Sequence, residues 1–177
     1  MSATVLIAYA TRSGTTREVA EVIKGELSET GLTAELVPMR EGTPPAEYAA
    51  VVLGVPLYMG RLLKDFHRFV EANRESLSKM PVWCFVLGPV ENKPEQFEEA
   101  RRQAEAQLMR HSWLRPVEMC IFGGCWDVRR MSFPMSLLRF LPAGKISAMD
   151  ARDWEAIRAW TRKIADPIEQ FAATPQP

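Results

Sequence analysis

The chain has 177 residues, 47% of them hydrophobic and 25% charged, which is the balance of a single globular domain. Its 22 basic and 22 acidic residues give a formal net charge of zero, so the bulk electrostatics do not indicate a nucleic-acid binder. The first apolar run lacks the features of a signal peptide and no apolar stretch approaches the roughly 20 residues that span a bilayer, so we expect a cytoplasmic protein.

Short apolar runs alternate along the chain with longer segments of helical periodicity. Strands are predicted at 4–9, 33–37, 48–55, 82–87 and 117–122. Helices are predicted over 19–27, 62–77, 97–108 and 157–168, with Asp150 or Asp153 as the N-cap of the last one. Five strands separated by helices predict an α/β fold, a doubly wound five-stranded parallel sheet with helices on both faces. This pattern alone leaves two strand orders open.

A loop rich in hydroxyl groups joins the first strand to the first helix. It consists of Thr11, Arg12, Ser13, Gly14, Thr15 and Thr16. Backbone N–H groups and the helix dipole favour an anion at such a junction, and each hydroxyl can donate to a phosphate oxygen. Because neither G-x-G-x-x-G nor G-K-[ST] is present, the loop predicts a monophosphate site. The alternative is an ordinary helix cap, although a cap needs one hydroxyl and not four.

The segment 6–16 resembles the phosphate loop of flavodoxins, in which T-G-N-T or T-G-T-T follows the first strand. Three further stretches, at 52–60, 112–116 and 153–157, are similar to the menaquinone-dependent protoporphyrinogen IX dehydrogenase family of bacteria. The resemblance implies strand order 2-1-3-4-5 with FMN at the carboxyl edge of the sheet. It also implies one FMN-binding domain over 1–172, with an insertion at about 126–149 after the fifth strand. The Ala, Thr, Pro and Gln composition of the last residues predicts a flexible tail at 173–177.

In a flavodoxin-like fold, the isoalloxazine ring lies between the loops that follow the third and fourth strands. The matching positions are Pro56, Leu57, Tyr58, Met59, Gly60, Gly88, Pro89, Val90, Glu91 and Asn92. Tyr58 is expected beside the ring, with an exposed loop tyrosine as the alternative. Glu91 and Asn92 stand where many flavodoxins have a stacking aromatic, so we expect one face of the flavin to be open to a substrate.

The insertion after the fifth strand combines apolar and basic residues. Between Trp126 and Lys145 it has four basic residues and one acid, a net charge of +3. Such a segment can cover an apolar ligand, rest on an anionic membrane surface or pack as an additional helix, and these alternatives stay open. The resemblance implies contact with a porphyrin and a quinone, which makes Trp126, Arg129 and Arg130 candidate substrate contacts, the guanidinium groups facing carboxylates.

The resemblance therefore leads us to expect an FMN-dependent oxidoreductase. It would pass electrons from an apolar reductant through FMN to a quinone, the flavin supplying the redox chemistry. The alternative is a non-enzymatic electron carrier, which the zero net charge disfavours because such carriers commonly steer their partners with a charged surface. Contact with the inner membrane and formation of a homodimer are left open.

The other reactive side chains form no catalytic pattern, and none is assigned a catalytic role. Cys84, Cys120 and Cys125 form no C-x-x-C pair and have no histidines at metal spacing, so we expect buried or half-buried thiols and no metal. His67 is expected as a solvated helix residue and His111 as a cation near a helix end.

Overall fold

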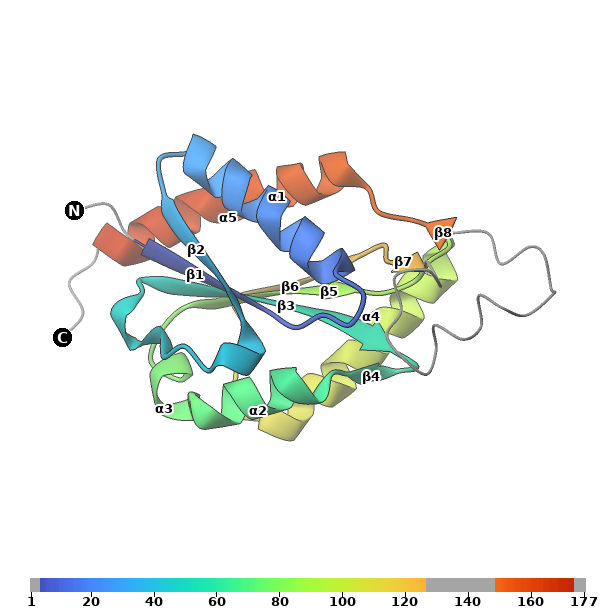
Figure 1. Ribbon diagram of the computed structural model, residues 1–177, viewed down its shortest axis with the longest axis horizontal. Coiled ribbons are helices and arrows are strands. Elements are labelled where there is room, and N and C mark those ends of the chain that lie inside the picture. The colour runs from blue at the N-terminus through green and yellow to red at the C-terminus, as the bar shows by residue number, and fades with distance from the viewer. Residues whose placement is uncertain (1–3, 127–148, 174–177) are drawn as a thin grey trace.

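The computed structural model describes residues 4–126 and 149–173, which form a sheet between two layers of helices (Figure 1). The strands are β1 (Thr4–Tyr9), β2 (Thr33–Pro38), β3 (Ala50–Tyr58), β4 (Arg61–Leu62), β5 (Val82–Leu87), β6 (Glu118–Phe122), β7 (Cys125–Trp126) and β8 (Met149–Asp150). The helices are α1 (Thr15–Glu29), α2 (Lys64–Ala72), α3 (Arg74–Leu77), α4 (Pro94–Leu108) and α5 (Trp154–Ala173), with 3-10 turns η1 (Met39–Glu41), η2 (Pro45–Glu47) and η3 (Met109–His111).

The main sheet has the order β2-β1-β3-β5-β6, and its neighbouring strands pair in parallel. The short β4 pairs antiparallel with β3 and lies off this path. Counted without β4, the order is 2-1-3-4-5, which confirms the predicted doubly wound sheet.

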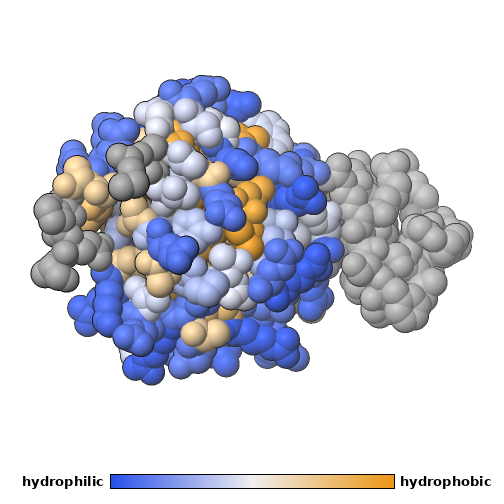
Figure 2. Space-filling view, turned by 60° about the vertical axis from the view of Figure 1, so that its left-hand side comes forward, coloured by the Kyte–Doolittle hydropathy of each residue, from blue (hydrophilic) through white to orange (hydrophobic). Residues whose placement is uncertain are grey.

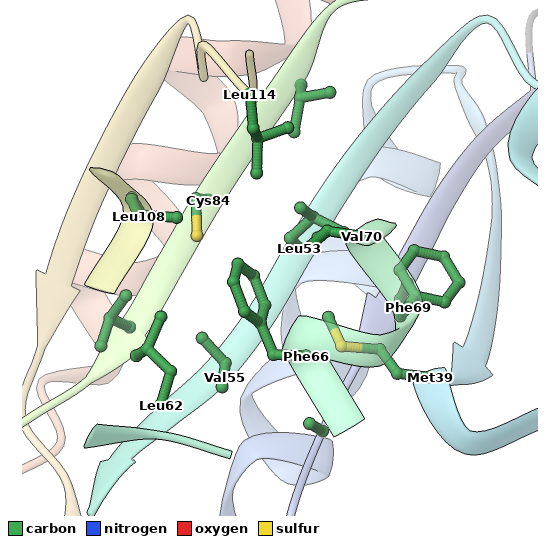
Figure 3. Close-up of a cluster of buried hydrophobic side chains, with 14 of the residues drawn as sticks. Met39, Leu53, Val55, Leu62, Phe66, Phe69, Val70, Cys84, Leu108 and Leu114 are labelled. Carbon is green, nitrogen blue, oxygen red and sulfur yellow. The ribbon is translucent and has the colours of Figure 1, made fainter. Parts of the chain in front are cut away.

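Each face of the sheet has its own buried core, because successive side chains of a strand point to opposite faces. Val5 and Ile7 of β1 pack with residues of α1 and α5, whereas Leu6 and Ala8 belong to the core shared with α2 and α4. Figure 3 shows this second core, with Phe66 of α2 beside Val55 of β3. Burial on both faces explains why the strands appear in the sequence as continuous apolar runs.

The carboxyl ends of the parallel strands meet at one edge of the sheet, on the right in Figure 1. Tyr9 pairs with Gly54, and Leu87 pairs with both Pro56 and Phe122. The segments that follow β1, β3, β5 and β6 therefore lie next to one another, which is where ligands bind in open α/β sheets.

The continuous helix predicted over 62–77 is wrong. Leu62 lies in β4, α2 ends at Ala72, and α3 is a separate short helix. The side-chain amide of Asn73 donates a hydrogen bond to the carbonyl of Phe69 at 2.9 Å, and such local bonds compete with helix continuation. Phe66, Phe69, Val70 and Leu77 are nevertheless buried as predicted.

The segment 56–60, expected as a loop, is mostly strand. β3 continues through Tyr58, and a two-residue turn then leads into β4. Met59 and Gly60 have φ values of 49° and 74°. Positive φ at both central residues is typical of the tight hairpin turn whose twist matches antiparallel strands. The aromatic side chain of Tyr58 is therefore fixed by strand pairing.

The described ends of the insertion form a small antiparallel ladder. Trp126 of β7 pairs with Met149 of β8, and Cys125 pairs with Asp150. The next helix, α5, begins at Trp154, where the Asp153 carboxylate accepts a hydrogen bond from the N–H of Ala156 at 2.9 Å. This confirms the predicted cap. Arg129, Arg130 and residues 174–177 of the predicted tail lie outside the described residues.

The cysteines are free thiols, buried at Cys84 and half-buried at Cys120 and Cys125, as expected. Burial raises the pKa of Cys84 to about 12 and that of Cys120 to about 11, so both thiols are inert.

Among the helices that the structure describes, none has the length and apolar character to cross a membrane. Figure 2 shows polar and charged side chains over most of the face it presents, with small apolar areas between them.

Candidate functional site

A cleft opens at the carboxyl edge of the sheet, and we call it the edge cleft. It holds about 590 Å³ of empty space, part of it open to solvent. It is lined by Thr11, Arg12, Ser13, Thr15, Thr16, Pro56, Leu57, Tyr58, Met59, Leu87, Gly88, Val90, Gly124 and Cys125. The structure thus brings together most of the residues predicted for a flavin. It adds Leu87, Gly124 and Cys125, which lie at or after the ends of β5 and β6.

The hydroxyl-rich loop forms one end of the edge cleft. Gly14, with φ of 85°, is the residue before α1, and its N–H donates to Thr11 Oγ1 at 2.9 Å. The hydroxyls of Ser13 and Thr15 share a hydrogen bond, with their oxygens 3.0 Å apart. Thr16 is only 1% exposed, and its hydroxyl has no hydrogen-bond partner among the described residues. At the N-terminus of α1, no side chain of the described residues forms a capping hydrogen bond. The hydroxyls are thus not explained by capping, and a ligand oxygen would satisfy Thr16.

Tyr58 forms the second wall of the edge cleft. The guanidinium carbon of Arg12 lies over the Tyr58 ring, 5.3 Å from its centroid, which is cation–π geometry. Leu57 and Met59 flank Tyr58 along the chain, and Met59 is 92% exposed at the tip of the turn. This wall is apolar apart from the Arg12 cation, so it suits a flat aromatic ligand.

The segments that follow β5 and β6 form the third wall, and glycines let their backbones come into contact. The N–H of Gly124 donates to the carbonyl of Pro89 at 2.7 Å, and the N–H of Ala151 donates to the carbonyl of Gly124 at 2.9 Å. A Cβ atom at Gly124 would lie 2.7 Å from the oxygen of Gly88, and one at Gly123 would lie 1.9 Å from the oxygen of Ala151. Glycine is therefore required where these three segments touch.

Arg152 ties the end of the insertion to α1, a link that the sequence does not reveal. Its side chain is 7% exposed and binds Asp150 through Nε and Nη2, at 2.8 and 2.6 Å. Its Nη1 reaches Glu18 of α1 at 2.5 Å, and the guanidinium lies over the ring of Trp154. The hydrogen bond to Asp150 raises the pKa of Arg152 above its ordinary value. Arg152 is thus a permanent cation that fixes β8 against the helix following the hydroxyl loop.

Some predicted residues do not line the edge cleft. Gly60 and Pro89 line a neighbouring hollow over α4, and Gly14 contributes through its backbone conformation. Glu91 forms an ion pair with Lys93 at 2.5 Å, which lowers the pKa of Glu91, and Asn92 is exposed. The backbone of Trp126 lies in β7, directly after Cys125 of the cleft lining.

The prediction that His67 is a solvated helix residue is wrong, whereas the predicted positive charge of His111, which lies near the end of α4, stays a prediction. His67 Nδ1 and His111 Nε2 share a hydrogen bond at 2.9 Å, and His111 Nδ1 lies 3.2 Å from Glu71 Oε2. His111 is buried and His67 is half-buried between α2 and η3. Burial, followed by the charges of Arg110 and His111, lowers the pKa of His67.

The described residues contain no group of three or more ligands arranged for a metal ion.

Comparison with known proteins agrees with this geometry. A family model described as a flavodoxin domain matches residues 6–136, which include the hydroxyl loop and both walls beyond it. This chain belongs to the flavodoxin domain family. Among solved structures, a flavodoxin from Pseudomonas aeruginosa, studied as a point mutant, superposes with a TM-score of 0.56 at 19% identity over 94% of this chain and 99% of that one. Flavodoxin 1 from Bacillus cereus gives 0.54 at 15% identity over 98% and 99%.

A curated enzyme also matches along nearly the whole chain. It is protoporphyrinogen IX dehydrogenase [quinone] from Escherichia coli (strain K12), 28% identical over 170 residues that cover 90% of this flavodoxin-family chain and 93% of the enzyme. The resemblance to that family stated from the sequence is thereby confirmed. At this identity, the match supports a flavoprotein related to oxidoreductases.

Proposed function

We propose that the edge cleft binds FMN. The phosphate would lie at the hydroxyl loop, where the N-terminal N–H groups of α1 and the unpartnered hydroxyl of Thr16 would donate to it. Tyr58, Met59, Gly88 and Val90 would border the isoalloxazine ring. The buried Thr16 hydroxyl is the observation that carries this assignment, because it is satisfied only when an acceptor occupies the loop.

We further propose that the chain is an oxidoreductase resembling protoporphyrinogen IX dehydrogenase. It would transfer electrons from an apolar reductant, through the chemistry that bound FMN supplies, to a quinone. The proposal is supported by the enzyme that matches along 90% of the chain, whose name states both its substrate and its acceptor. Trp126, Arg129 and Arg130 remain proposed substrate contacts. We place the protein in the cytoplasm, with the inner membrane as the source of quinone.

Two measurements test these proposals in turn. Purified protein should be yellow and release one FMN per chain on denaturation, and a colourless protein that FMN does not titrate would contradict the cofactor assignment. FMN-loaded protein should then consume protoporphyrinogen IX anaerobically only when a menaquinone analogue is present. Absence of turnover with fully loaded flavin would rule out the proposed reaction while leaving the cofactor site intact.

A second candidate is a non-enzymatic electron carrier. One observation favours it: within the described part of the chain, the lining of the edge cleft contains no histidine, lysine or carboxylate to move a proton. A carrier would exchange electrons with a protein reductase at rates that saturate with that partner. It would show no saturation with either the porphyrinogen or the quinone, which separates the two candidates.

A further inference from the structure

Arg12 is the one charged side chain among the described residues that line the edge cleft. The rest of the lining consists of hydroxyls, apolar side chains, a thiol and glycine backbone. Arg12 is exposed, and no carboxylate of the described residues forms an ion pair with it. An arginine in this position is an attractive site for an anion that comes from solution.

A cation–π contact with Tyr58 positions the guanidinium of Arg12. The guanidinium carbon lies over the Tyr58 ring, 5.3 Å from its centroid. Among the described residues, none accepts a hydrogen bond from the N–H groups of Arg12, whose planar fork matches the two oxygens of a carboxylate. Because Tyr58 is fixed at the end of β3, the fork is held ready at the mouth of the cleft.

The carboxylates around the cleft already have cationic partners. Glu18 and Asp150 are bound by Arg152, and Glu91 is bound by Lys93 at 2.5 Å and by Gln96 at 3.0 Å. Arg12 is thus left as a cation that these acids do not neutralise.

We propose that Arg12 binds a carboxylate of the molecule that exchanges electrons with the flavin. The site would therefore prefer carboxylated reactants over neutral ones. This inference rests on the proposed flavin oxidoreductase function. The phosphate of FMN is the other source of an anion near this loop. The side chain of Arg12, however, lies against Tyr58 at the strand end, whereas the hydroxyls of Ser13, Thr15 and Thr16 line the loop end of the cleft.

The experiment uses FMN-loaded protein and a matched pair of acceptors. The probes are a 1,4-naphthoquinone with a propionic acid side chain and its methyl ester, which differ in charge but not in the quinone ring. After photoreduction, flavin reoxidation is followed by stopped flow against acceptor concentration for wild type, Arg12→Gln, Arg12→Lys and Arg17→Gln. Arg17 is a matched control because it is exposed, lies outside the cleft and pairs with Glu21.

We expect Arg12→Gln to raise the half-saturating concentration of the acid about tenfold or more, the usual weight of a charge-assisted hydrogen bond, and to leave the ester within about twofold. Arg12→Lys should give an intermediate value for the acid, since it keeps the charge but loses the fork. Arg17→Gln should change neither. Equal behaviour of acid and ester in wild type, or an equal loss for both in Arg12→Gln, would overturn the inference.

The two anion sources are separated by measuring FMN and riboflavin dissociation constants for the same variants. If Arg12→Gln weakens FMN and not riboflavin, and acid and ester respond alike, Arg12 serves the phosphate and the inference fails. The proposed reaction is judged separately. If wild type does not oxidise protoporphyrinogen IX but the Arg12-dependent contrast between acid and ester persists, the inference holds and the named substrate is wrong.

Discussion

Thr16 lies at the first turn of α1 with its hydroxyl buried and unpartnered among the described residues. A buried polar atom without a partner destabilises the protein in its unliganded form, and a ligand that satisfies it gains a well-placed donor. The same atom therefore has opposite effects on the free protein and on the complex. A purely structural threonine would have its effect on the free protein alone.

We predict that Thr16→Val, which keeps the shape and removes the hydroxyl, weakens FMN binding by about tenfold or more. The free energy of unfolding of the protein without FMN should stay unchanged or rise. Fluorescence titration with FMN and urea denaturation of the apoprotein measure the two effects. Riboflavin, which has no phosphate, is the control ligand, and an equal loss of affinity for both ligands would contradict a phosphate contact.

Gly123 provides a second test at a single position, because its missing side chain allows the 151 segment to touch the cleft wall. We predict that Gly123→Ala lowers the free energy of unfolding by about 2–3 kcal/mol, since the added methyl group would overlap backbone atoms of Ala151. Gly25→Ala is the matched control, because Gly25 lies inside α1 with nothing near its Cβ position. That change should stabilise by about 0.5–1 kcal/mol. Urea denaturation midpoints that shift equally would contradict the packing argument.

At the scale of elements, the features that neighbouring residues in the sequence determine, such as buried strands and a helix cap, were predicted correctly. The strands were recognised because apolar residues cover both of their faces, and Asp153 was recognised as a cap. The break at Asn73 was missed, because the apolar stripe continues through it into Leu77. β3 was predicted too short, because Met59-Gly60 does not have the Asn-Gly composition usual for its turn. The Arg152–Glu18 pair joins residues 134 positions apart, so no local pattern could reveal it.

The pair of histidines joins α2 to η3, and His67 makes this junction sensitive to pH. The pKa of His67 is lowered in the folded state, so the unfolded chain binds a proton more readily than the folded one. The free energy of unfolding should therefore fall as the pH decreases through about 6.5, the ordinary pKa of histidine, and the loss should level off below the lowered pKa.

Urea denaturation between about pH 5.5 and 7.5 measures this dependence. We predict that His67→Gln, which cannot take up a proton, shows a shallower dependence than wild type. A slope equal to that of wild type would mean that His67 does not contribute.

At the scale of the whole molecule, strand order and layers followed from the resemblance and were confirmed, and so was the meeting of the hydroxyl loop with the segment around Tyr58. If FMN binds only the folded chain, it must raise the stability of the entire domain, by about 2.7 kcal/mol when free FMN is about 100 times its dissociation constant. We predict a rise in melting temperature with FMN and a smaller one with riboflavin at the same concentration. Equal rises would show that the hydroxyl loop does not distinguish the phosphate.

The ladder of β7 and β8 brings the two ends of the segment 127–148 to adjacent positions, since Trp126 pairs with Met149. A two-residue turn such as Asn-Gly would close the same hairpin. Segments of different length therefore fit between β7 and β8 while the hydroxyl loop, Tyr58 and the glycine wall stay in place.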